Sequence, residues 1–423
     1  MHDHHGEDEM AETQARAVRR EALIVGGGMV GAALAALLGE AGVTVTLLDA
    51  RPAPLDREAV GRGQPARRVS AITPVSQRLL ERLGAWPWMA GRRVTPYHRM
   101  RVWDAEGSGE VGFSADQAGV PALGHIVEND VVLAGLEARL AELPSVQLRL
   151  GARVADLRET AGGREVVLEG GERLAAPLVV AADGARSPLR ERAGIGVASR
   201  DTGHVAVVTT VRTARPHGGV ARQAFLATGP LAFLPLTVAD DDRYCSIVWS
   251  TTPAEAQRLV ALSASALGEA LGEAFAGRMG AVSVTDEALA VPLTQRHAEA
   301  YVRPGFALVG DAAHSIHPLA GQGVNLGLMD AAVLAEELLA ARRRGMAMGE
   351  ASALTRYARR RRGDNAAMLA LMDGFRLLFG TRHPALTLAR NLGLSGVDRL
   401  VPVKRLLMRQ AIGERGRLPD SCR

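Results

Sequence analysis

The feature that most constrains this chain is a glycine-rich turn that follows its first apolar segment. Residues 21–25 have the character of a buried strand, and residues 29–41 predict a helix that ends at Gly42. A second apolar run at residues 43–48 completes the order strand, helix, strand. This order is typical of a βαβ unit, so we expect the fold to begin with a parallel sheet.

The glycines of this turn have the spacing G-x-G-x-x-G of a dinucleotide-binding fingerprint. Gly26 permits a tight turn, Gly28 lets a pyrophosphate approach the backbone, and Gly31 allows the helix to pack closely on the strand. Asp49 ends the second strand, where an acid can hold a ribose hydroxyl. An acid here disfavours a 2′-phosphate, so the pattern indicates FAD or NAD and not NADP.

A second glycine-rich stretch, GDAAHSIHPLAGQGVN at residues 310–325, follows an apolar strand-like run and precedes a segment with helical spacing. Asp311 is placed to accept hydrogen bonds from hydroxyl groups. Gly321 and Gly323 would let a flat ring approach the backbone. The helix expected to begin near Asn325 presents free N–H groups and a positive dipole end, which favour an electron-rich partner.

Two shorter motifs fit the same kind of site, although each has an ordinary structural explanation. In ADGARSPLR, Asp183 suits ribose or pyrophosphate contacts, but Asp-Gly is a common turn and Ser187 a good helix N-cap. In RVSAI, Arg68 would lie against a cofactor or its phosphate, and a surface arginine is the alternative. LGHIVEN precedes a helix for which Asn129 or Asp130 is the expected N-cap.

The middle of the chain has a different pattern. Strands at residues 205–211, 232–236 and 245–249, with one Ala/Leu/Glu-rich helix near residues 253–278, predict a mostly antiparallel sheet inserted into the first domain. The expected division is a disordered tail (1–20), a discontinuous cofactor-binding domain (21–95, 122–195 and 295–345), a substrate domain (96–121 and 196–294) and a C-terminal helical region (346–423).

Composition limits location and partners. The 423-residue chain has two cysteines, Cys245 and Cys422, which exclude a disulfide framework or a Cys-rich metal site. No apolar run is long enough for a bilayer span and the first residues do not form a secretory signal, so we expect a cytoplasmic protein. No nucleic-acid motif accompanies the late basic residues. The basic, amphipathic residues 398–412 would either touch the inner membrane peripherally or dock onto the protein.

In this order the motifs resemble those of FAD-dependent aromatic hydroxylases related to p-hydroxybenzoate hydroxylase. Within that group the chain is similar to the bacterial ubiquinone-biosynthesis hydroxylases, over about residues 21–413. VGGGMVG, RVSAI, LGHIVEN, ADGARSPLR and GDAAHSIHPLAGQGVNLG carry the resemblance. It implies an α/β fold with a Rossmann-like FAD-binding domain of the GR2 type, an inserted mostly antiparallel substrate sheet, and C-terminal helices.

The resemblance also implies the roles of individual residues. The ADP half of FAD would lie on the fingerprint turn and Asp49, with Arg68 and Asp183 beside the cofactor and Asp311 on its ribityl chain. The residues implied in the second stretch, besides Asp311, are Gly310, Pro318, Gly321, Gln322, Gly323 and Asn325. NAD(P)H would be a transient reductant. No catalytic base is identified, and His125, His314 and His317 are candidates that are more often structural.

The activity implied by the resemblance is hydroxylation of a polyprenylphenol by O₂ in ubiquinone biosynthesis, through a flavin C4a-hydroperoxide. The subgroup that PYHRMRVWD, FLPL and GFRLLFG most resemble acts at ring position C5. A complex with other ubiquinone-biosynthesis proteins would bring such a membrane-resident substrate to the enzyme. Two alternatives stay open: a hydroxylase of a small soluble aromatic compound, and a non-catalytic FAD-binding member of a biosynthetic complex.

Overall fold

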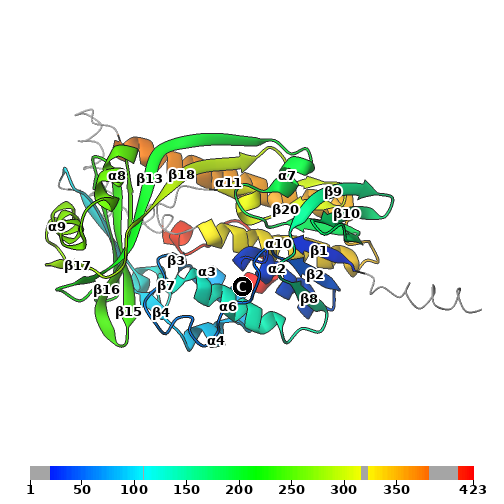
Figure 1. The fold of residues 1–423 in the computed structure, drawn as a ribbon, viewed down its shortest axis with the longest axis horizontal. Coiled ribbons are helices and arrows are strands. Elements are labelled where there is room, and N and C mark those ends of the chain that lie inside the picture. Colours follow the sequence, from blue (N-terminus) through cyan, green and yellow to red (C-terminus); the bar gives the residue numbers. More distant parts are fainter. Residues whose placement is uncertain (1–19, 108, 316–322, 381–407) are drawn as a thin grey trace, which may run out of the picture.

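The computed structural model describes residues 20–107, 109–315, 323–380 and 408–423. Figure 1 shows a mostly parallel sheet covered by helices on one side of the molecule and a large, mostly antiparallel sheet on the other. Two long strands, β13 (Val197–Thr213) and β18 (Leu289–Ala298), run from one part to the other. The predicted α/β fold with an inserted antiparallel sheet is confirmed.

The sheet of the cofactor-binding part has six strands in the order β19-β20-β12-β1-β2-β8. All neighbours are parallel except β19 and β20. The bounds are β1 (Ala22–Val25), β2 (Val45–Leu48), β8 (Val146–Arg149), β12 (Leu178–Ala181), β19 (Val302–Arg303) and β20 (Phe306–Leu308). Every residue of β1 and β12 is buried, which explains their unbroken apolar sequences.

Helices cover this sheet and the segments beside it. In chain order they are α2 (Met29–Glu40), α3 (Pro74–Arg82), α4 (Trp86–Ala90), α6 (Asn129–Leu140), α7 (Pro188–Arg192), the 3₁₀ turn η1 (Gly310–Ala312), α10 (Gly323–Arg342), α11 (Ala351–Gly380) and the 3₁₀ turn η2 (Asp420–Cys422). The sequence did not predict a separate three-stranded antiparallel sheet, β9 (Val154–Thr160), β10 (Gly163–Leu168) and β11 (Arg173–Ala176), which contacts the inner strands β12 and β1.

Helix α2 is almost entirely buried because it contacts the sheet as well as α6 and α10. Its contact with α10 depends on a glycine: a Cβ on Gly327 would lie 2.6 Å from Cγ2 of Val30. Helix α10 begins at Gly323, slightly before the start expected near Asn325. The N-terminus of α2 and the N-terminus of α10 therefore belong to the same packed region.

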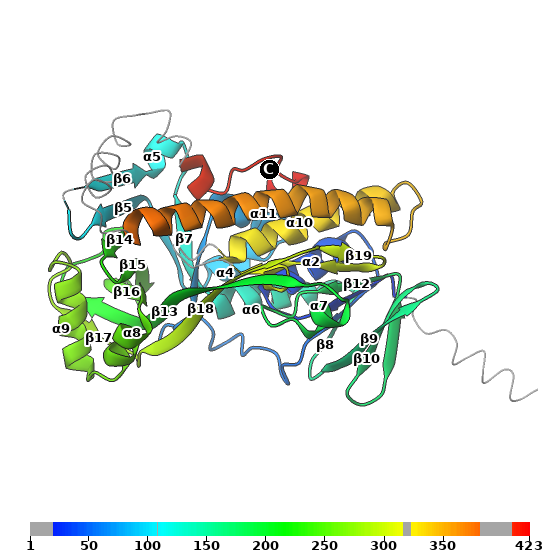
Figure 2. The same ribbon diagram turned by 90° about the horizontal axis from the view of Figure 1, so that it is seen from above.

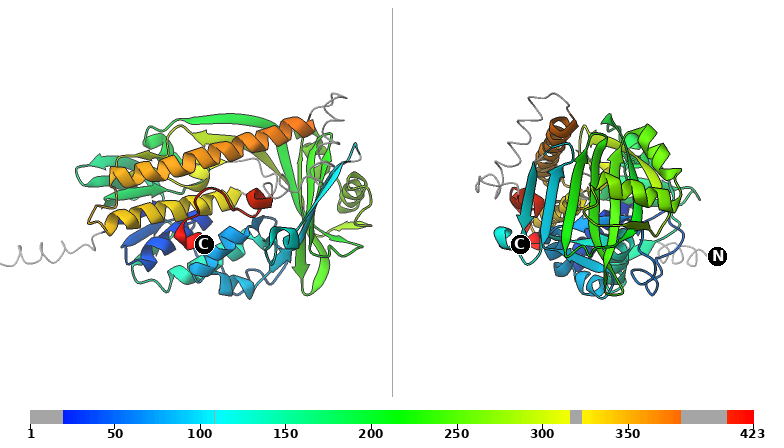
Figure 3. Two further views of the ribbon diagram at one scale, coloured as in Figure 1. Left: turned by 180° about the vertical axis from the view of Figure 1, so that it is seen from behind. Right: turned by 90° about the vertical axis from the view of Figure 1, so that its left-hand side faces the viewer.

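The large sheet has the order β21-β18-β13-β16-β15-β14-β5-β6, with β17 also paired to β13. Neighbours are antiparallel except β14 and β5. The remaining bounds are β5 (Arg99–Asp104), β6 (Glu110–Ser114), β14 (Val220–Leu226), β15 (Gly229–Val238), β16 (Asp241–Thr251), β17 (Val282–Val284) and β21 (His314–Ser315), and the short helix α5 (Ala115–Ala118) follows β6. The right-hand view of Figure 3 shows these strands side by side across one end of the molecule.

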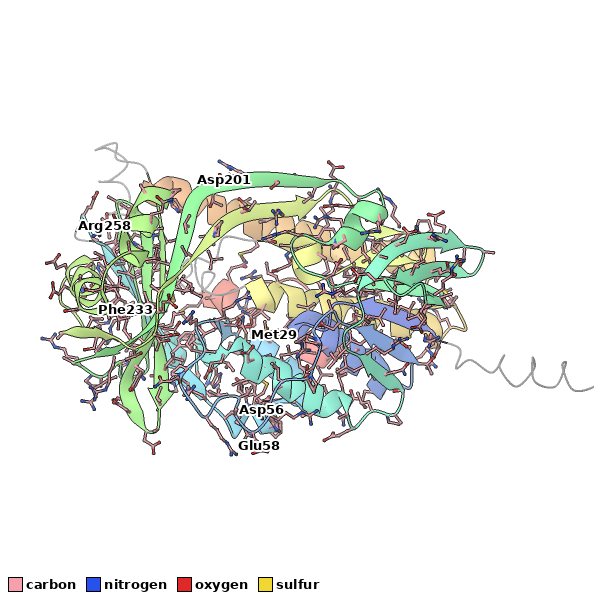
Figure 4. The ribbon with its side chains drawn as sticks, in the orientation of Figure 1. Met29, Asp56, Glu58, Asp201, Phe233 and Arg258 are labelled. Carbon is pink, nitrogen blue, oxygen red and sulfur yellow. The ribbon has the colours of Figure 1, made fainter. Side chains whose placement is uncertain are left out.

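Two helices, α8 (Pro253–Val260) and α9 (Ala264–Ala274), cover one face of the large sheet. The single helix expected over residues 253–278 is therefore wrong. Ser263 interrupts it, because its side chain accepts a hydrogen bond from the Ala266 N–H and starts a new helix. Phe233 belongs to the core beneath α9 and lies far from Met29 at the start of α2, as Figure 4 shows.

The other face of the large sheet packs against a small antiparallel sheet with the order β3-β7-β4. The bounds are β3 (Val69–Ile72), β4 (Val94–Tyr97) and β7 (Gly124–Glu128). Helix α6 follows β7 directly, with Glu128 as its N-cap residue. The expected caps Asn129 and Asp130 are thus wrong, and the Asn129 side chain instead accepts a hydrogen bond from Ser70 Oγ at 2.7 Å.

Helices α10 and α11 lie side by side, as Figure 2 shows, and a buried ion pair joins them. Asp330 Oδ1 lies 2.7 Å from Arg361 Nε, and both side chains are almost completely buried. Asn365 donates to the same oxygen at 3.1 Å, and His314 lies 2.5 Å from the other. Burial by itself would raise the pKa of Asp330, but His314 and Arg361 lower it to about 2.

We expect Asp330→Ala to destabilise the protein by about 3–5 kcal/mol, since it leaves the Arg361 charge buried without its partner. Asp364→Ala is the matched control: Asp364 also contacts Arg361, at 3.2 Å, but is exposed, and its loss should cost less than about 1 kcal/mol. The free energy of unfolding from urea titrations measures both. Equal losses for the two variants would contradict this account of the ion pair.

The contribution of Asp330 to the free energy of unfolding depends on pH in a definite direction. The pKa of Asp330 is lower in the folded protein than in the unfolded chain, so its contribution to stability is complete above about pH 4. That contribution is lost as the pH falls through about 2. The stability difference between the wild type and Asp330→Ala should therefore shrink in acid, which unfolding titrations at several pH values can measure.

Among the described helices, none combines the length and the apolar character needed to cross a bilayer.

Candidate active site

The three fingerprint glycines differ in what an added Cβ atom would meet at each position. Gly26 has φ +106°, and a Cβ there would lie 2.2 Å from the carbonyl oxygen of Ala182 at the end of β12. A Cβ on Gly31 would lie 1.9 Å from the carbonyl oxygen of Gly26, so α2 packs directly on the turn. A Cβ on Gly28 meets nothing within 4 Å. Gly26 and Gly31 are thus required by packing, whereas Gly28 borders open space at the start of α2.

Asp49 is held beneath this turn by backbone N–H groups. Its Oδ2 accepts a hydrogen bond from Gly27 at 2.5 Å, and its Oδ1 accepts one from Arg51 at 2.7 Å. A Cβ on Gly27 would lie 2.9 Å from the Asp49 side chain, so Gly27 also has to be small. Gly27 was not predicted as a site residue, although it lies inside the fingerprint. The fixed carboxylate retains lone pairs for the hydroxyls of a ribose.

Asp183 follows β12, close to the same turn. Its Oδ2 accepts a hydrogen bond from the Leu189 N–H at 3.2 Å, while its buried Oδ1 has no hydrogen-bond partner within the described ranges. Burial raises the pKa of this carboxyl above its usual value. Ser187 caps α7 by accepting from the Arg190 N–H, as predicted. A buried acceptor without a partner is costly in isolation and suits a bound hydroxyl or N–H donor.

Arg190 joins the two loops of the site. Its Nη1 donates to the carbonyl oxygen of Ala185 at 3.3 Å and to that of Ala312 at 2.9 Å. The guanidinium thus fixes the loop after β12 against the turn η1, which carries Asp311. Nothing in the sequence distinguished this arginine from its exposed neighbours Arg186 and Arg192.

Asp311 lies in a concave part of the surface. Its side chain is accessible to solvent and yet surrounded by protein, and this loss of hydration raises its pKa. The nearby His314 and Arg68 act in the opposite direction and stabilise the charged form. No hydrogen bond to its carboxylate occurs within the described part of the chain. The carboxylate is therefore available to a ligand with hydroxyl groups.

The loop that carries Arg68 is positioned by the LGHIVEN segment. Glu128 pairs with Arg93 at 2.5 Å and accepts a hydrogen bond from the Ala66 N–H at 2.7 Å. The backbone N–H of Asn129 donates to the carbonyl oxygen of Arg68 at 3.0 Å. Glu128 and Arg93 are functional residues that the sequence argument missed, because their partners are far away in the chain. They hold Arg68 near Asp311.

Asn325 links the start of α10 to β3. Its Oδ1 accepts a hydrogen bond from the Thr73 N–H at 3.0 Å, and its Nδ2 donates to the carbonyl oxygen of Ala71 at 2.8 Å. A Cβ on Gly323, in the same helical turn, would meet nothing within 4 Å. The Asn325 side chain thus fixes β3 against α10, and Gly323 leaves space at the helix N-terminus.

The candidate histidines differ in their surroundings. His125 packs edge-on against Trp86, and burial together with His98 lowers its pKa to about 4. His314 is buried and bonded to Asp330. Both have structural contacts, and neither geometry assigns a base. The remaining predicted residues, His317, Pro318, Gly321 and Gln322, lie outside the described residues.

The described residues fit FAD. Gly28 leaves space at the start of α2, one oxygen of Asp183 is unpaired and the carboxylate of Asp311 is available, and α2 and α10 contact each other. The fingerprint turn and Asp49 would hold the ADP half, and Asp311 the ribityl hydroxyls. The N-terminus of α10 would face the ring. Helix N-termini stabilise negative charge on a bound group.

Comparison with known proteins shows the family and the fold of the chain. The family model described as "FAD binding domain" matches residues 19–371. The solved structure of p-nitrophenol 4-monooxygenase PnpA from Pseudomonas putida DLL-E4 has a TM-score of 0.74 at 22% identity and covers 94% of this chain and 99% of its own. Klebsiella pneumoniae HpxO, complexed with FAD and uric acid, has a TM-score of 0.70 at 20% identity and covers 92% and 97%. The chain therefore belongs to the FAD binding domain family, and its fold is that of these solved structures.

Relatives that are similar in sequence define the family more closely. The 3-demethoxyubiquinol 3-hydroxylase of Escherichia coli (strain K12) is 41% identical over 394 residues, which cover 93% of this chain and 98% of that protein. Ubiquinone hydroxylase UbiL of Rhodospirillum rubrum is 39% identical over 93% of this chain and 89% of its own. The chain belongs to the family of FAD-dependent hydroxylases of ubiquinone biosynthesis, as its motifs predicted.

Gly28→Ala and Gly31→Ala form a matched pair. Because the added methyl group at residue 28 meets open space, we expect Gly28→Ala to fold normally but to lose FAD affinity at least about tenfold. Gly31→Ala should instead lower the melting temperature of the apoprotein, since its methyl group would collide with the Gly26 carbonyl. Flavin absorbance after gel filtration and thermal unfolding measure the two effects. Normal flavin content in Gly28→Ala would contradict the assigned phosphate approach.

Proposed function

We propose that the protein hydroxylates the aromatic ring of a polyprenylphenol in ubiquinone biosynthesis, with C5 as the ring position that its sequence favours. The observation that carries the proposal is an apolar cavity beside the cofactor residues, between the small sheet and the large sheet. The two relatives above are named for demethoxyubiquinol and for ubiquinone, which supports this substrate class. The relative from E. coli is named for a different ring position, so product analysis has to decide the position.

The cavity is lined mainly by apolar side chains from both sheets and from the C-terminal segment. Its lining residues include Met100, Phe113, Leu123, Ile126, Leu234 and Met408. Such a lining suits a prenyl chain, because each buried CH₂ group contributes about 0.8 kcal/mol to binding.

The chain's own residues would bind, orient and shield the reactants. FAD, when bound, supplies the oxygen activation that ring hydroxylation requires. The large sheet covers the cavity and excludes water from it, and the N-terminus of α10 favours negative charge beside it. Arg67 fixes the two parts against each other, because it forms a bidentate ion pair with Asp286, at 2.6 and 2.9 Å, across the gap between the sheets. We find no group in the described residues that geometry assigns as a base.

A polyprenyl substrate resides in the membrane, so we propose that the protein meets it at the membrane surface or through other proteins of the pathway. The described part of the C-terminal segment fits two roles, docking onto the protein and contact with the membrane surface. Met408 and Ile412 are buried against the protein, whereas Arg409 is exposed. Residues 398–407 of the predicted amphipathic segment lie outside the described residues.

The proposal predicts a hydroxylated prenylphenol as the product. Deleting the gene should cause a precursor that lacks one ring hydroxyl to accumulate, and the purified protein with FAD, NAD(P)H and ¹⁸O₂ should add one ¹⁸O atom to a short-chain prenylphenol. Mass spectrometry measures both. Normal ubiquinone together with an accumulated soluble aromatic compound would point to the alternative substrate, and FAD binding without any turnover to the non-catalytic role.

Asp311→Ala tests the cofactor assignment on which this function depends. We expect at least about a tenfold loss of FAD affinity, since a charge-assisted hydrogen bond contributes roughly 1.5–3 kcal/mol. Asp420→Ala, at an exposed acid far along the chain, is the control and should keep its flavin. Full flavin content in Asp311→Ala would remove the ribityl assignment.

A further inference from the structure

Two polar side chains face the apolar cavity without a hydrogen-bond partner. Tyr97, at the end of β4, is 8% exposed, and Gln223, in β14, is 5% exposed. Both line the cavity, and within the described ranges neither side chain forms a hydrogen bond. The polar atoms of both side chains keep some accessible surface, so they are available from the cavity. Two such groups in one cavity therefore indicate a polar ligand.

Tyr97 is placed for this role by its neighbour in the small sheet. Tyr97 pairs with Gly124 of β7, and a Cβ on Gly124 would lie 2.8 Å from the Tyr97 hydroxyl oxygen. A larger residue at position 124 would thus displace the phenol ring. Burial raises the pKa of Tyr97 to about 12, so its hydroxyl is protonated at neutral pH and can donate a hydrogen bond.

Gln223 shares the cavity-facing side of β14 with Ala221, since alternate residues of a strand face the same side. Arg222 has the only charged side chain among the described residues that line this cavity. Its guanidinium donates to the carbonyl oxygens of His217, at 2.9 Å, and Val220, at 3.2 Å. Its strand partner Phe233 belongs to the core on the opposite face. The hydrogen-bonding side chains that the described residues present to the cavity are therefore neutral.

The cavity also shares a wall with the cofactor site. Ala71 of β3 lines the cavity, and the Asn325 side chain holds its carbonyl oxygen from the first turn of α10. The same strand begins directly after Arg68. Three residues of extended chain span roughly 10 Å, so a ligand in the cavity is within reach of a ring bound at the N-terminus of α10.

We propose that Tyr97 and Gln223 form the polar part of the substrate site and select an uncharged phenol over an aromatic carboxylate. This inference rests on the proposed function and adds the charge of the substrate to it. A phenol oxygen or a ring methoxy group can pair with the Tyr97 hydroxyl or the Gln223 amide. A carboxylate entering the same cavity would lose its hydration without gaining a cationic partner.

Binding titrations test this selection directly. The FAD-loaded, full-length protein is titrated with 2-geranylphenol and with 3-geranyl-4-hydroxybenzoate at pH 7.5, and the change in flavin absorbance gives each Kd. We expect the neutral phenol to bind at least about 30-fold more tightly than the carboxylate. Tyr97→Phe and Gln223→Leu should each weaken phenol binding about five- to tenfold, in line with the loss of one hydrogen bond.

Two further variants separate a polar role from a structural one. Glu273→Gln, at an exposed residue of α9 outside this cavity, should bind the phenol within about twofold of wild type. Gln223→Arg should improve carboxylate binding relative to phenol, a change that a loss of packing alone would not produce. Flavin content and melting temperature show that each variant is folded.

The outcomes separate this inference from the proposed function. If the wild type binds and hydroxylates the neutral phenol but Tyr97→Phe and Gln223→Leu bind it as tightly, the assignment of these two residues is overturned and the function stands. Equal binding of the carboxylate by the wild type overturns the charge selection. If the wild type neither binds nor hydroxylates either prenylated compound, the proposed function fails and this inference fails with it.

Discussion

The buried carboxylate of Asp330 is the contact on which the cofactor-binding part depends most. It accepts hydrogen bonds from the Gly310 N–H, His314, Arg361 and Asn365, which come from the loop after β20 and from α11. A buried carboxylate is tolerated only when it is paired and fully hydrogen-bonded. One side chain therefore fixes α10, α11 and the loop that carries Asp311 relative to one another, and no local interaction could replace it.

Strand β3 connects the cofactor-binding part of the structure to the substrate cavity. Its start is held by the contacts of Glu128 and Asn129, which place Arg68 near Asp311. Its far end is held by Asn325, and the side chain of Ala71 faces the cavity. Four residues of extended chain thus form a wall between the cofactor site and the cavity. The position of the cofactor ring and the shape of the substrate site are consequently set by the same backbone.

The sequence was informative where a residue's role depends on local backbone geometry. Gly26 and Gly31 could be recognised because a strand-to-helix turn permits no side chain there, and Ser187 because N-caps are local. It was uninformative where the partner is distant. Arg361 lies in a run of arginines that resembles a solvated helix face, and only the fold brings it to Asp330. Ser263 divided a continuous helical pattern, because its cap outweighed the propensity of the neighbouring alanines.

The cofactor side of the site presents charged groups, whereas the cavity side presents neutral ones. This difference follows from the kind of ligand that each side would bind. The cofactor side presents carboxylates, an arginine and a helix N-terminus, all suited to phosphates and hydroxyls. The cavity side presents Tyr97, Gln223 and apolar side chains. A charged group in the cavity would be desolvated without a partner, since Arg222, the one arginine among the described lining residues, is engaged with backbone carbonyls. The boundary between these environments lies at β3, between the residues that would hold FAD and those that line the cavity.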